Sequence, residues 1–239
     1  SLALLTHELI SAAESDEAAV ICEQHWTEEA LEVMRVANSP LYAGLDVGRK
    51  VDLSVLTVLE RVGEVFYVRG MLRMRNLRLP EQEQRLKELC RCRQVRQVCI
   101  DMTGLGLGLF EYAQRHMGEH MISGINFSSS VKATKVIREE GSNRETVRVT
   151  EAMAMELLRV YEDRKMRQPR DWQLREDLRR PGKVTTPGGK VSIAAVRDGA
   201  GHADHFWSLA LAIEAAGGAS QPFYYQSFKL KGKYDDCGL

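Results

Sequence analysis

Three aspartates stand at positions of this sequence where chemistry is expected. Asp46 ends the apolar run Leu41–Asp46, and Asp101 ends a second apolar run, Val95–Asp101. A glycine-bearing turn follows each of them, as it would at the end of a strand. Asp204 lies in the first turn of a predicted helix rich in Ala and Leu. A buried charge without a partner costs several kcal/mol, so such acids usually have a partner, often a metal ion.

The carboxyl ends of strands in an open α/β sheet are where binding sites gather, so Asp46 and Asp101 are expected to lie close together. A helix start favours a carboxylate by about 0.3–1 kcal/mol, which keeps Asp204 ionised. Three converging carboxylates suit a hard cation with oxygen ligands, Mg²⁺ or Mn²⁺. Two such ions promote phosphodiester hydrolysis. Taken singly, the first two acids are as easily turn formers, and the third a surface acid at a helix start.

Two histidines flank the third aspartate, His202 on one side and His205 on the other. Two histidines and an acid could bind zinc, but no third nitrogen or sulfur ligand is evident nearby. A second interpretation is that they orient the metal-bound carboxylate or carry a proton. A third is that they only cap the helix. Asp198 could also approach this site from the segment before the helix.

Basic residues near these acids could hold a nucleic acid. Lys132 and Lys135 follow a predicted strand beside the site and could contact a scissile phosphate, unless they are simply solvated. Lys190 lies near the tip of a predicted hairpin that could flank a DNA groove. The densest basic tract could follow a DNA backbone in a salt-sensitive manner, or be a solvated face. Its members are Arg164, Lys165, Arg167, Arg170, Arg175, Arg179, Arg180 and Lys183.

The pattern of apolar residues and breakers predicts a mixed α/β sheet with helices on both faces. Three antiparallel strands are expected first, followed by alternating helices and parallel strands, with an added hairpin near the end. The expected strands are 41–46, 52–61, 64–71, 95–101 and 120–127, and the hairpin is 184–196, with its turn at 187–189. The expected helices are 80–93, 109–117, 143–164, 171–180 and 202–216.

The two ends of the chain differ from its body. Residues 1–39 hold eight acids and one base, Arg35, which leaves 32 basic and 25 acidic residues in the rest. This acidic leader is expected to be helical, with Thr27 as an N-cap. It is interpreted either as a linker or docking segment, or as a packed terminal helix. Residues 40–217 form the expected domain, and 218–239 a tail without periodicity.

Composition excludes several classes of protein. The chain has 239 residues, 44% hydrophobic and 28% charged, which is ordinary for a globular protein. No apolar run approaches the roughly 18 residues that a membrane span needs. Five cysteines without a CxxC pair indicate reduced thiols. No phosphate-binding loop of an ATPase occurs, and the three tryptophans are expected to be packing groups.

Three motifs together resemble a known family. They are Gly44-Leu45-Asp46-Val47-Gly48, Cys99-Ile100-Asp101-Met102-Thr103-Gly104-Leu105-Gly106, and Gly201-His202-Ala203-Asp204-His205-Phe206-Trp207-Ser208-Leu209-Ala210-Leu211-Ala212. Gly124-Ile125-Asn126-Phe127, followed by the two lysines, also fits. In these motifs the chain resembles the nuclease domain of a phage large terminase subunit of the Mu-like prophage type, with a ribonuclease-H-like fold.

The resemblance, over about residues 40–217, implies a metal-dependent endonuclease that cuts double-stranded DNA during phage genome packaging. Asp46, Asp101 and Asp204 would be its metal-binding catalytic triad, and Asp52 would stand where related nucleases can carry an auxiliary acid. Residues 1–39 would connect the domain to an ATPase motor. The implied partners are that motor, the small terminase subunit and the portal, and the implied location is the host cytoplasm.

Other functions stay open at this point. A transposase or a junction resolvase of the same fold would share the acids and differ in the basic elements around them. An actin-like phosphotransferase would need a second half with its own acid-glycine turn, and the chain is too short for that. A non-catalytic docking module would use the acids only as turn residues.

Overall fold

The computed structural model describes residues 2–17, 19–48, 53–132, 146–185, 191–195 and 203–217. The strands are β1 (Leu2–Ala3), β2 (Val20–Glu23), β3 (Leu41–Asp46), β4 (Leu53–Val62), β5 (Val65–Arg75), β6 (Val95–Asp101), β7 (Ile122–Ile125), β8 (Ser130–Lys132), β9 (Thr146–Arg148), β10 (Met166–Arg167), β11 (Pro181–Thr185) and β12 (Val191–Ala195). The helices are α1 (His7–Ala13), α2 (Glu28–Arg35), α3 (Leu79–Cys90), α4 (Gly106–Met117), α6 (Val149–Glu162), α7 (Trp172–Arg179) and α8 (Asp204–Ala215).

The centre of the fold is a mixed sheet in the order β10-β5-β4-β3-β6-β7, with β2 also paired to β5. Strands β3, β4 and β5 form an antiparallel meander, because short turns connect them. Strands β6 and β7 continue the sheet in parallel with β3, each reached through a helix. The sequence prediction of three antiparallel strands followed by parallel ones is confirmed, and this is a ribonuclease-H-like arrangement.

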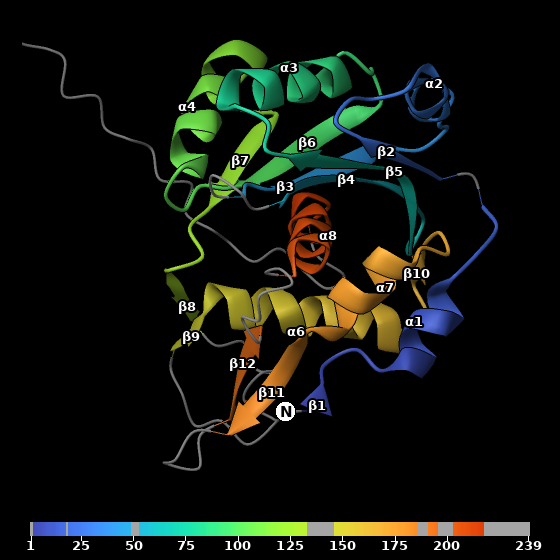
Figure 1. Ribbon diagram of the computed structural model, residues 1–239, viewed down its shortest axis with the longest axis vertical. Helices are drawn as coiled ribbons and strands as arrows, with labels where there is room; N and C mark the ends of the chain where they lie inside the picture. Colours follow the sequence, from blue (N-terminus) through green and yellow to red (C-terminus); the bar gives the residue numbers. More distant parts are fainter. Residues whose placement is uncertain are drawn as a thin grey trace, which may run out of the picture.

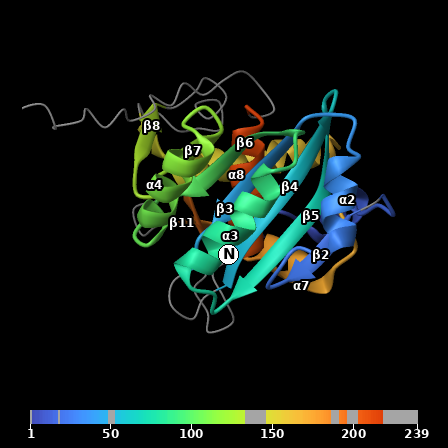
Figure 2. The same ribbon diagram turned by 90° about the horizontal axis from the view of Figure 1, so that it is seen from above.

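Helices cover both faces of this sheet, as Figures 1 and 2 show. Helices α2, α3 and α4 pack on one face through a cluster of buried apolar residues that includes Leu45, Leu56 and Leu72. Helix α8 lies against the other face, and α6, α7 and α1 pack around it in the same cluster. Nearly all of α8 is buried, which explains its apolar composition, because a helix enclosed on all sides has no polar face.

The first 39 residues are not wholly helical, so that part of the prediction is wrong. Strand β2 pairs in parallel with β5, from Val20 opposite Gly70 to Glu23 opposite Arg73. Helix α2 then packs on the sheet through Ala30 and Met34, which are buried. A four-residue strand has little signal in its own sequence. Strand β2 forms because it can pair with the edge of β5.

Most other elements follow the prediction apart from their ends, but the short strands β8 and β10 are absent from it. The predicted helix 143–164 begins only at Val149, because residues 146–148 form β9, which pairs with β8. Strands β11 and β12 form the predicted hairpin, whose turn lies outside the described residues, and β1 adds to it. No helix in the described part of the chain is long and apolar enough to cross a bilayer.

Candidate active site

Asp46 and Asp101 lie at the carboxyl ends of two neighbouring parallel strands. Leu45 of β3 stands opposite Ile100 of β6, so the next residue on each strand is an aspartate. Side chains alternate between the faces of a sheet, and Leu45 and Ile100 belong to the apolar cluster under α2, α3 and α4. Both aspartates therefore point to the opposite face, the one that α8 covers.

Helix α8 runs antiparallel to β3 and begins at the edge where the two aspartates lie. Ser208 Oγ donates to the carbonyl oxygen of Gly44 at 2.8 Å, and the last turn of the helix meets the other end of the meander, where Arg61 donates to the Ala216 carbonyl at 2.9 Å. Asp204 precedes Ser208 by four residues, about 6 Å of helix, while Asp46 follows Gly44 by two residues, about 7 Å of strand. Asp204 thus lies at the level of Asp46.

The close approach of α8 to the sheet depends on Gly44. A Cβ atom at this position would stand 2.2 Å from the Ser208 carbonyl oxygen and 2.3 Å from the Ala212 nitrogen, both backbone atoms that cannot move aside. Ser208 Oγ also lies 2.7 Å from Thr57 Oγ1 on β4, which ties the helix to a second strand. The missing side chain of Gly44 and this hydrogen bond together fix where the helix rests.

The turn after Asp101 is equally tight. Thr103 donates its N–H to Asp101 Oδ1 at 2.9 Å, and Thr103 Oγ1 accepts from the Phe127 N–H at 3.0 Å. A Cβ at Gly106 would stand 1.8 Å from the Asp101 carbonyl oxygen and 3.5 Å from a methyl carbon of Val47. The residue after Asp46 therefore packs beside the backbone of Asp101, which brings the two strand ends together.

The donor set at this edge fits a hard divalent cation. Asp46, Asp101 and Asp204 supply only carboxylate oxygens, and each residue is at most 8% exposed to solvent. Among the residues that the structure describes, no group of three His, Cys, Asp or Glu side chains is arranged to hold a metal ion. The fold thus brings the three acids to one edge and one face, without drawing them into a closed cluster.

His205 turns its ring away from metal ligation. Its Nε2 atom accepts from Arg73 Nε at 2.8 Å, and its Nδ1 atom lies 2.6 Å from Asp177 Oδ2. Because both ring nitrogens are engaged in these contacts, His205 is not available as a zinc ligand. Arg73 and Asp177 carry no signal in the sequence, since nothing in their neighbourhood resembles a motif, and only the fold shows that they meet beside Asp204.

Four arginines of the basic tract, all predicted to contact DNA, lie in different environments. Arg167 stands opposite Tyr67 on β5, which is level with the beginning of β3, about 16 Å of strand away from Asp46. Arg170 pairs with Asp16 of the leader at 3.3 Å, with both side chains exposed. Arg179 is exposed, 3.9 Å from Glu176. Arg180 donates to Asp177 at 2.9 Å, so it alone among these four contacts the group that holds His205.

Five predicted site residues lie outside the described residues, so the structure does not place them: Asp52, Lys135, Lys190, Asp198 and His202. Lys132 is the last residue of β8, paired with Thr146 of β9. The segment that leads to it is tied to the turn after Asp101 through the Phe127 N–H.

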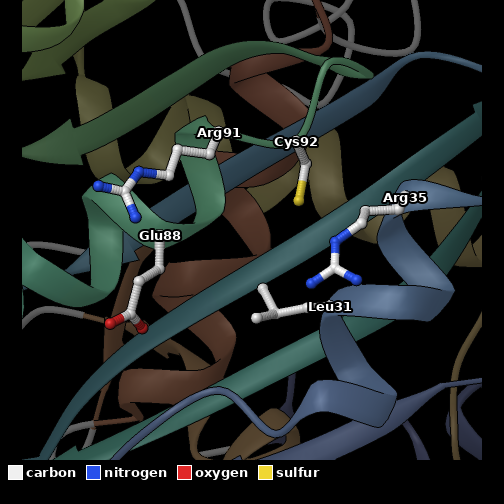
Figure 3. A pocket seen from close by; sticks show the side chains of 5 residues that line it. All are labelled: Leu31, Arg35, Glu88, Arg91 and Cys92. Atoms are coloured by element: carbon white, nitrogen blue, oxygen red, sulfur yellow. The ribbon is translucent and has the colours of Figure 1, made fainter.

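A pocket of about 240 Å³ lies on the other side of the sheet, between α2 and α3 (Figure 3). Leu31 and Arg35 of α2 face Glu88, Arg91 and Cys92 across it. Its Arg35 already pairs with two glutamates of α2, at 2.7 and 3.0 Å. The pocket is separated from the aspartates by the sheet and is not part of the candidate active site.

The tryptophans behave differently from one another. Trp26 is buried, and Trp207 stacks obliquely on Phe127 and edge-on against Phe206, so both are packing groups as expected. Trp172 is 71% exposed at the start of α7, so the expectation that it packs inside the protein is wrong. The reason is local, because Trp172 follows the N-cap Asp171 and points away from the face that α7 buries.

Fold and site together define a nuclease of the ribonuclease-H-like class. Residues 43–216 match the family model described as "Terminase RNaseH-like domain", and the chain belongs to that family. It is therefore a nuclease domain of a phage large terminase, an enzyme that cuts DNA during genome packaging. The match sets aside the transposase and junction-resolvase alternatives. No curated protein matches the chain.

Solved structures of other terminase nucleases share the fold. The magnesium-bound nuclease from thermophilic phage G20c is 22% identical, with a TM-score of 0.54 over 73% of this chain and 80% of that one. The nuclease domain from Thermus phage P74-26 is 21% identical, with a TM-score of 0.56 over 77% and 83%. The manganese-bound nuclease domain of the large terminase subunit of bacterial virus Sf6, a K428A mutant, is 13% identical, with a TM-score of 0.58 over 89% and 99%.

Proposed function

We propose that this domain hydrolyses phosphodiester bonds of double-stranded DNA, with Asp46, Asp101 and Asp204 holding two Mg²⁺ or Mn²⁺ ions. One observation carries the assignment of residues: neighbouring parallel strands each end in an aspartate that points to the face where α8 begins with a third. The relatives crystallised with magnesium and manganese support these two cations. The ions, when bound, would make a water molecule more acidic and stabilise charge on the phosphate.

The chain's own residues supply the frame for this chemistry. The ends of β3 and β6 hold Asp46 and Asp101 on a rigid sheet. The close contact of α8 with Gly44 determines where Asp204 lies along that sheet. Burial keeps the acids away from bulk water, which strengthens their interaction with a cation. The oxygen-only donor set favours Mg²⁺ or Mn²⁺ over zinc, since the His205 ring is held elsewhere.

Several finer assignments belong to the same proposal. The motifs support a terminase of the Mu-like prophage type that works in the host cytoplasm with an ATPase motor, a small terminase subunit and a portal. Asp52 would serve as an auxiliary ligand, while His202, His205 and Asp198 would support the metal-bound carboxylates. The proposed DNA contacts are Lys132, Lys135, Arg167, Arg170, Arg179, Arg180 and Lys190. Residues 1–39 would join the motor and 218–239 would form a tail.

A plasmid-nicking assay tests the proposal. Supercoiled DNA is incubated with the protein in Mg²⁺, Mn²⁺ or EDTA, and the wild type is compared with Asp46→Asn and Asp204→Asn. Losing a metal ligand removes several kcal/mol of transition-state stabilisation, so each variant is expected to cut about 10³-fold more slowly. Asp163→Asn is the matched control, because this exposed acid at the end of α6 only neighbours Lys165.

Three results would contradict the proposal. Cleavage that persists in EDTA would remove the role of the metal. Activity that survives both Asp46→Asn and Asp204→Asn would show that the acids are turn residues, and a wild type inactive under every condition would favour the docking module. Circular dichroism melts of each variant confirm that a lost activity does not reflect a lost fold.

A further inference from the structure

Among the described residues, the one that precedes α8 does not cap the first turn of the helix with its side chain. Ala203, the residue before it, is buried in a left-handed conformation, with φ 62° and ψ 40°, and supplies no side-chain hydrogen bond. This conformation costs a non-glycine residue roughly 1 kcal/mol, and the free N–H groups of a helix start need acceptors. The turn that carries Asp204 receives such an acceptor from another helix.

Asp177 of α7 supplies this acceptor. Its Oδ2 atom accepts from the main-chain N–H of His205 at 3.1 Å and lies 2.6 Å from His205 Nδ1. Its other oxygen accepts from Arg180 Nε at 2.9 Å. Burial alone would raise the pKa of the Asp177 carboxyl, but the hydrogen bonds from His205 and the charge of Arg180 hold this pKa below its ordinary value. Asp177 thus caps α8 from a neighbouring helix as a carboxylate.

Arg73 of β5 holds the same histidine from the other side. Its Nε–H donates to His205 Nε2 at 2.8 Å, so Nε2 is the acceptor nitrogen and Nδ1 carries the proton donated to Asp177. The Arg73 guanidinium is itself buried, and it also pairs with Asp171, the N-cap of α7, and with Glu23 of β2 at 3.3 Å. One arginine thereby joins the sheet to both helices.

We propose that Asp177 and Arg73 are positioning residues that fix the first turn of α8, and through it the direction of the Asp204 carboxylate. The inference rests on the proposed function, because it assumes that Asp204 is a metal ligand. Metal ligands must be held to within about 0.5 Å of their productive geometry. Supporting groups of this kind typically contribute 10–100-fold to metal affinity.

The test is Mn²⁺ binding measured by isothermal titration calorimetry, independently of cleavage. Asp177→Ala is expected to bind Mn²⁺ about 10–100-fold more weakly than the wild type at a temperature where thermal melts show it folded. Arg61→Ala is the matched control, since it removes the hydrogen bond to the Ala216 carbonyl oxygen at the last turn of the same helix, the end away from the aspartates. It should melt at a lower temperature and retain the wild-type affinity for Mn²⁺.

A merely structural role would lower the melting temperature and leave the affinity unchanged. Wild-type Mn²⁺ affinity in folded Asp177→Ala therefore overturns the proposal. If that variant does not fold, Asp177→Asn replaces it, because the amide keeps one acceptor oxygen for His205 and loses the charge and the oxygen that accepts from Arg180. It should bind Mn²⁺ several-fold more weakly than the wild type, and unchanged affinity would again overturn the proposal.

Nitrogen NMR of the histidine rings gives a second readout. His205 should carry its ring proton on Nδ1 in the wild type, and a ring protonated on Nε2 would contradict the Arg73 contact. The failure of this inference is separable from failure of the proposed function. A wild type that binds no Mn²⁺ and cuts no DNA defeats the function, whereas a normal wild type with unaffected Asp177 variants defeats only the positioning role.

Discussion

The two faces of the central sheet are packed in different ways. Under α2, α3 and α4 the contact is a layer of apolar side chains, such as Leu56 of β4 and Leu86 of α3. Under α8 the helix backbone rests directly on Gly44, and buried polar groups join helix to sheet, among them the pairs Ser208–Thr57 and His205–Arg73.

The difference lies in how strongly each contact fixes a position. Apolar burial stabilises in proportion to area and has little directional preference, so a helix on such a layer tolerates small shifts. Hydrogen bonds between buried groups weaken steeply when their geometry changes, and leaving one partner unmet costs about 1–3 kcal/mol. The face that carries the candidate active site is therefore the one held by directional contacts. Matched substitutions on the two faces can test this difference.

The largest difference in stability is expected between two glycine-to-alanine substitutions, one on each face of the sheet. Gly44→Ala drives a Cβ to 2.2 Å from the backbone of α8, whereas Gly70→Ala on the opposite face meets side-chain atoms of Trp26 and Met34 at 3.2 and 3.4 Å. Side chains can shift by a few tenths of an ångström and a helix backbone cannot. Gly44→Ala should therefore lose the folded state or several kcal/mol of stability, and Gly70→Ala should remain folded.

Urea unfolding followed by circular dichroism measures both variants. If Gly44→Ala is as stable as Gly70→Ala, helix α8 is free to shift on the sheet. In that case the α8 face would fix the position of its helix no more strongly than the opposite face does.

A smaller effect is expected from the half-buried Glu214 of α8 beside the buried Glu156 of α6. Burial, with the nearby charge of Glu156, raises the pKa of Glu214 from an ordinary value of 4.5 to about 7. Between these values the folded chain holds a proton that the unfolded chain has released, so stability falls as the pH rises through this window. Glu214→Gln removes the penalty, and its advantage should grow to about 1–3 kcal/mol by pH 7.5.

Thermal melts of both proteins from pH 5 to pH 8 check this prediction. The difference in melting temperature should widen up to about pH 7 and then level off, at about 2–4 °C for each kcal/mol. A difference independent of pH would mean that Glu214 titrates normally, and that this side of α8 is better solvated than the structure indicates.

The smallest effects are expected where the leader meets the basic tract. Arg175 makes a two-pronged pair with the Glu14 carboxylate, whose side chain is only 6% exposed, at 2.6 Å. Arg170 and Asp16 pair at 3.3 Å with both side chains exposed. Arg170→Ala should change stability by less than about 0.5 kcal/mol. Arg175→Ala should lower the melting temperature by more, because it leaves Glu14 buried without this partner.

Equal melting temperatures for the two variants would show that the buried ion pair stabilises the protein no more than the exposed one. The same variants inform the DNA proposal. If Arg170→Ala also leaves the salt dependence of cleavage unchanged, Arg170 serves the leader and not the DNA backbone.

Much of the sheet could be predicted because its signals are local. Strands β3 and β6 have the predicted ends, since each is an apolar run closed by an acid and a turn. The Asp204 helix was equally visible, because a run of Ala and Leu residues after a glycine-rich segment has few other interpretations. The positions of all three aspartates follow from these elements and the parallel pairing of β3 with β6.

What the sequence hides is contact between distant segments. Strand β2 forms only because β5 offers it an edge, and the Arg73–His205 bond joins residues 132 positions apart. Asp177, 28 positions from His205, resembles any surface acid of an amphipathic helix until the fold buries it. The basic tract appeared continuous along the chain, but the fold distributes its arginines over different partners, including the acidic leader.

The central claim is that Asp46, Asp101 and Asp204 hold the divalent cations at one edge of the sheet. Crystals of the domain grown with Mn²⁺, measured at the manganese absorption edge, locate such ions directly by anomalous scattering. Anomalous peaks are expected between the ends of β3 and β6 and the start of α8, within about 2.0–2.6 Å of carboxylate oxygens. Manganese bound elsewhere, with none at this edge, would contradict it.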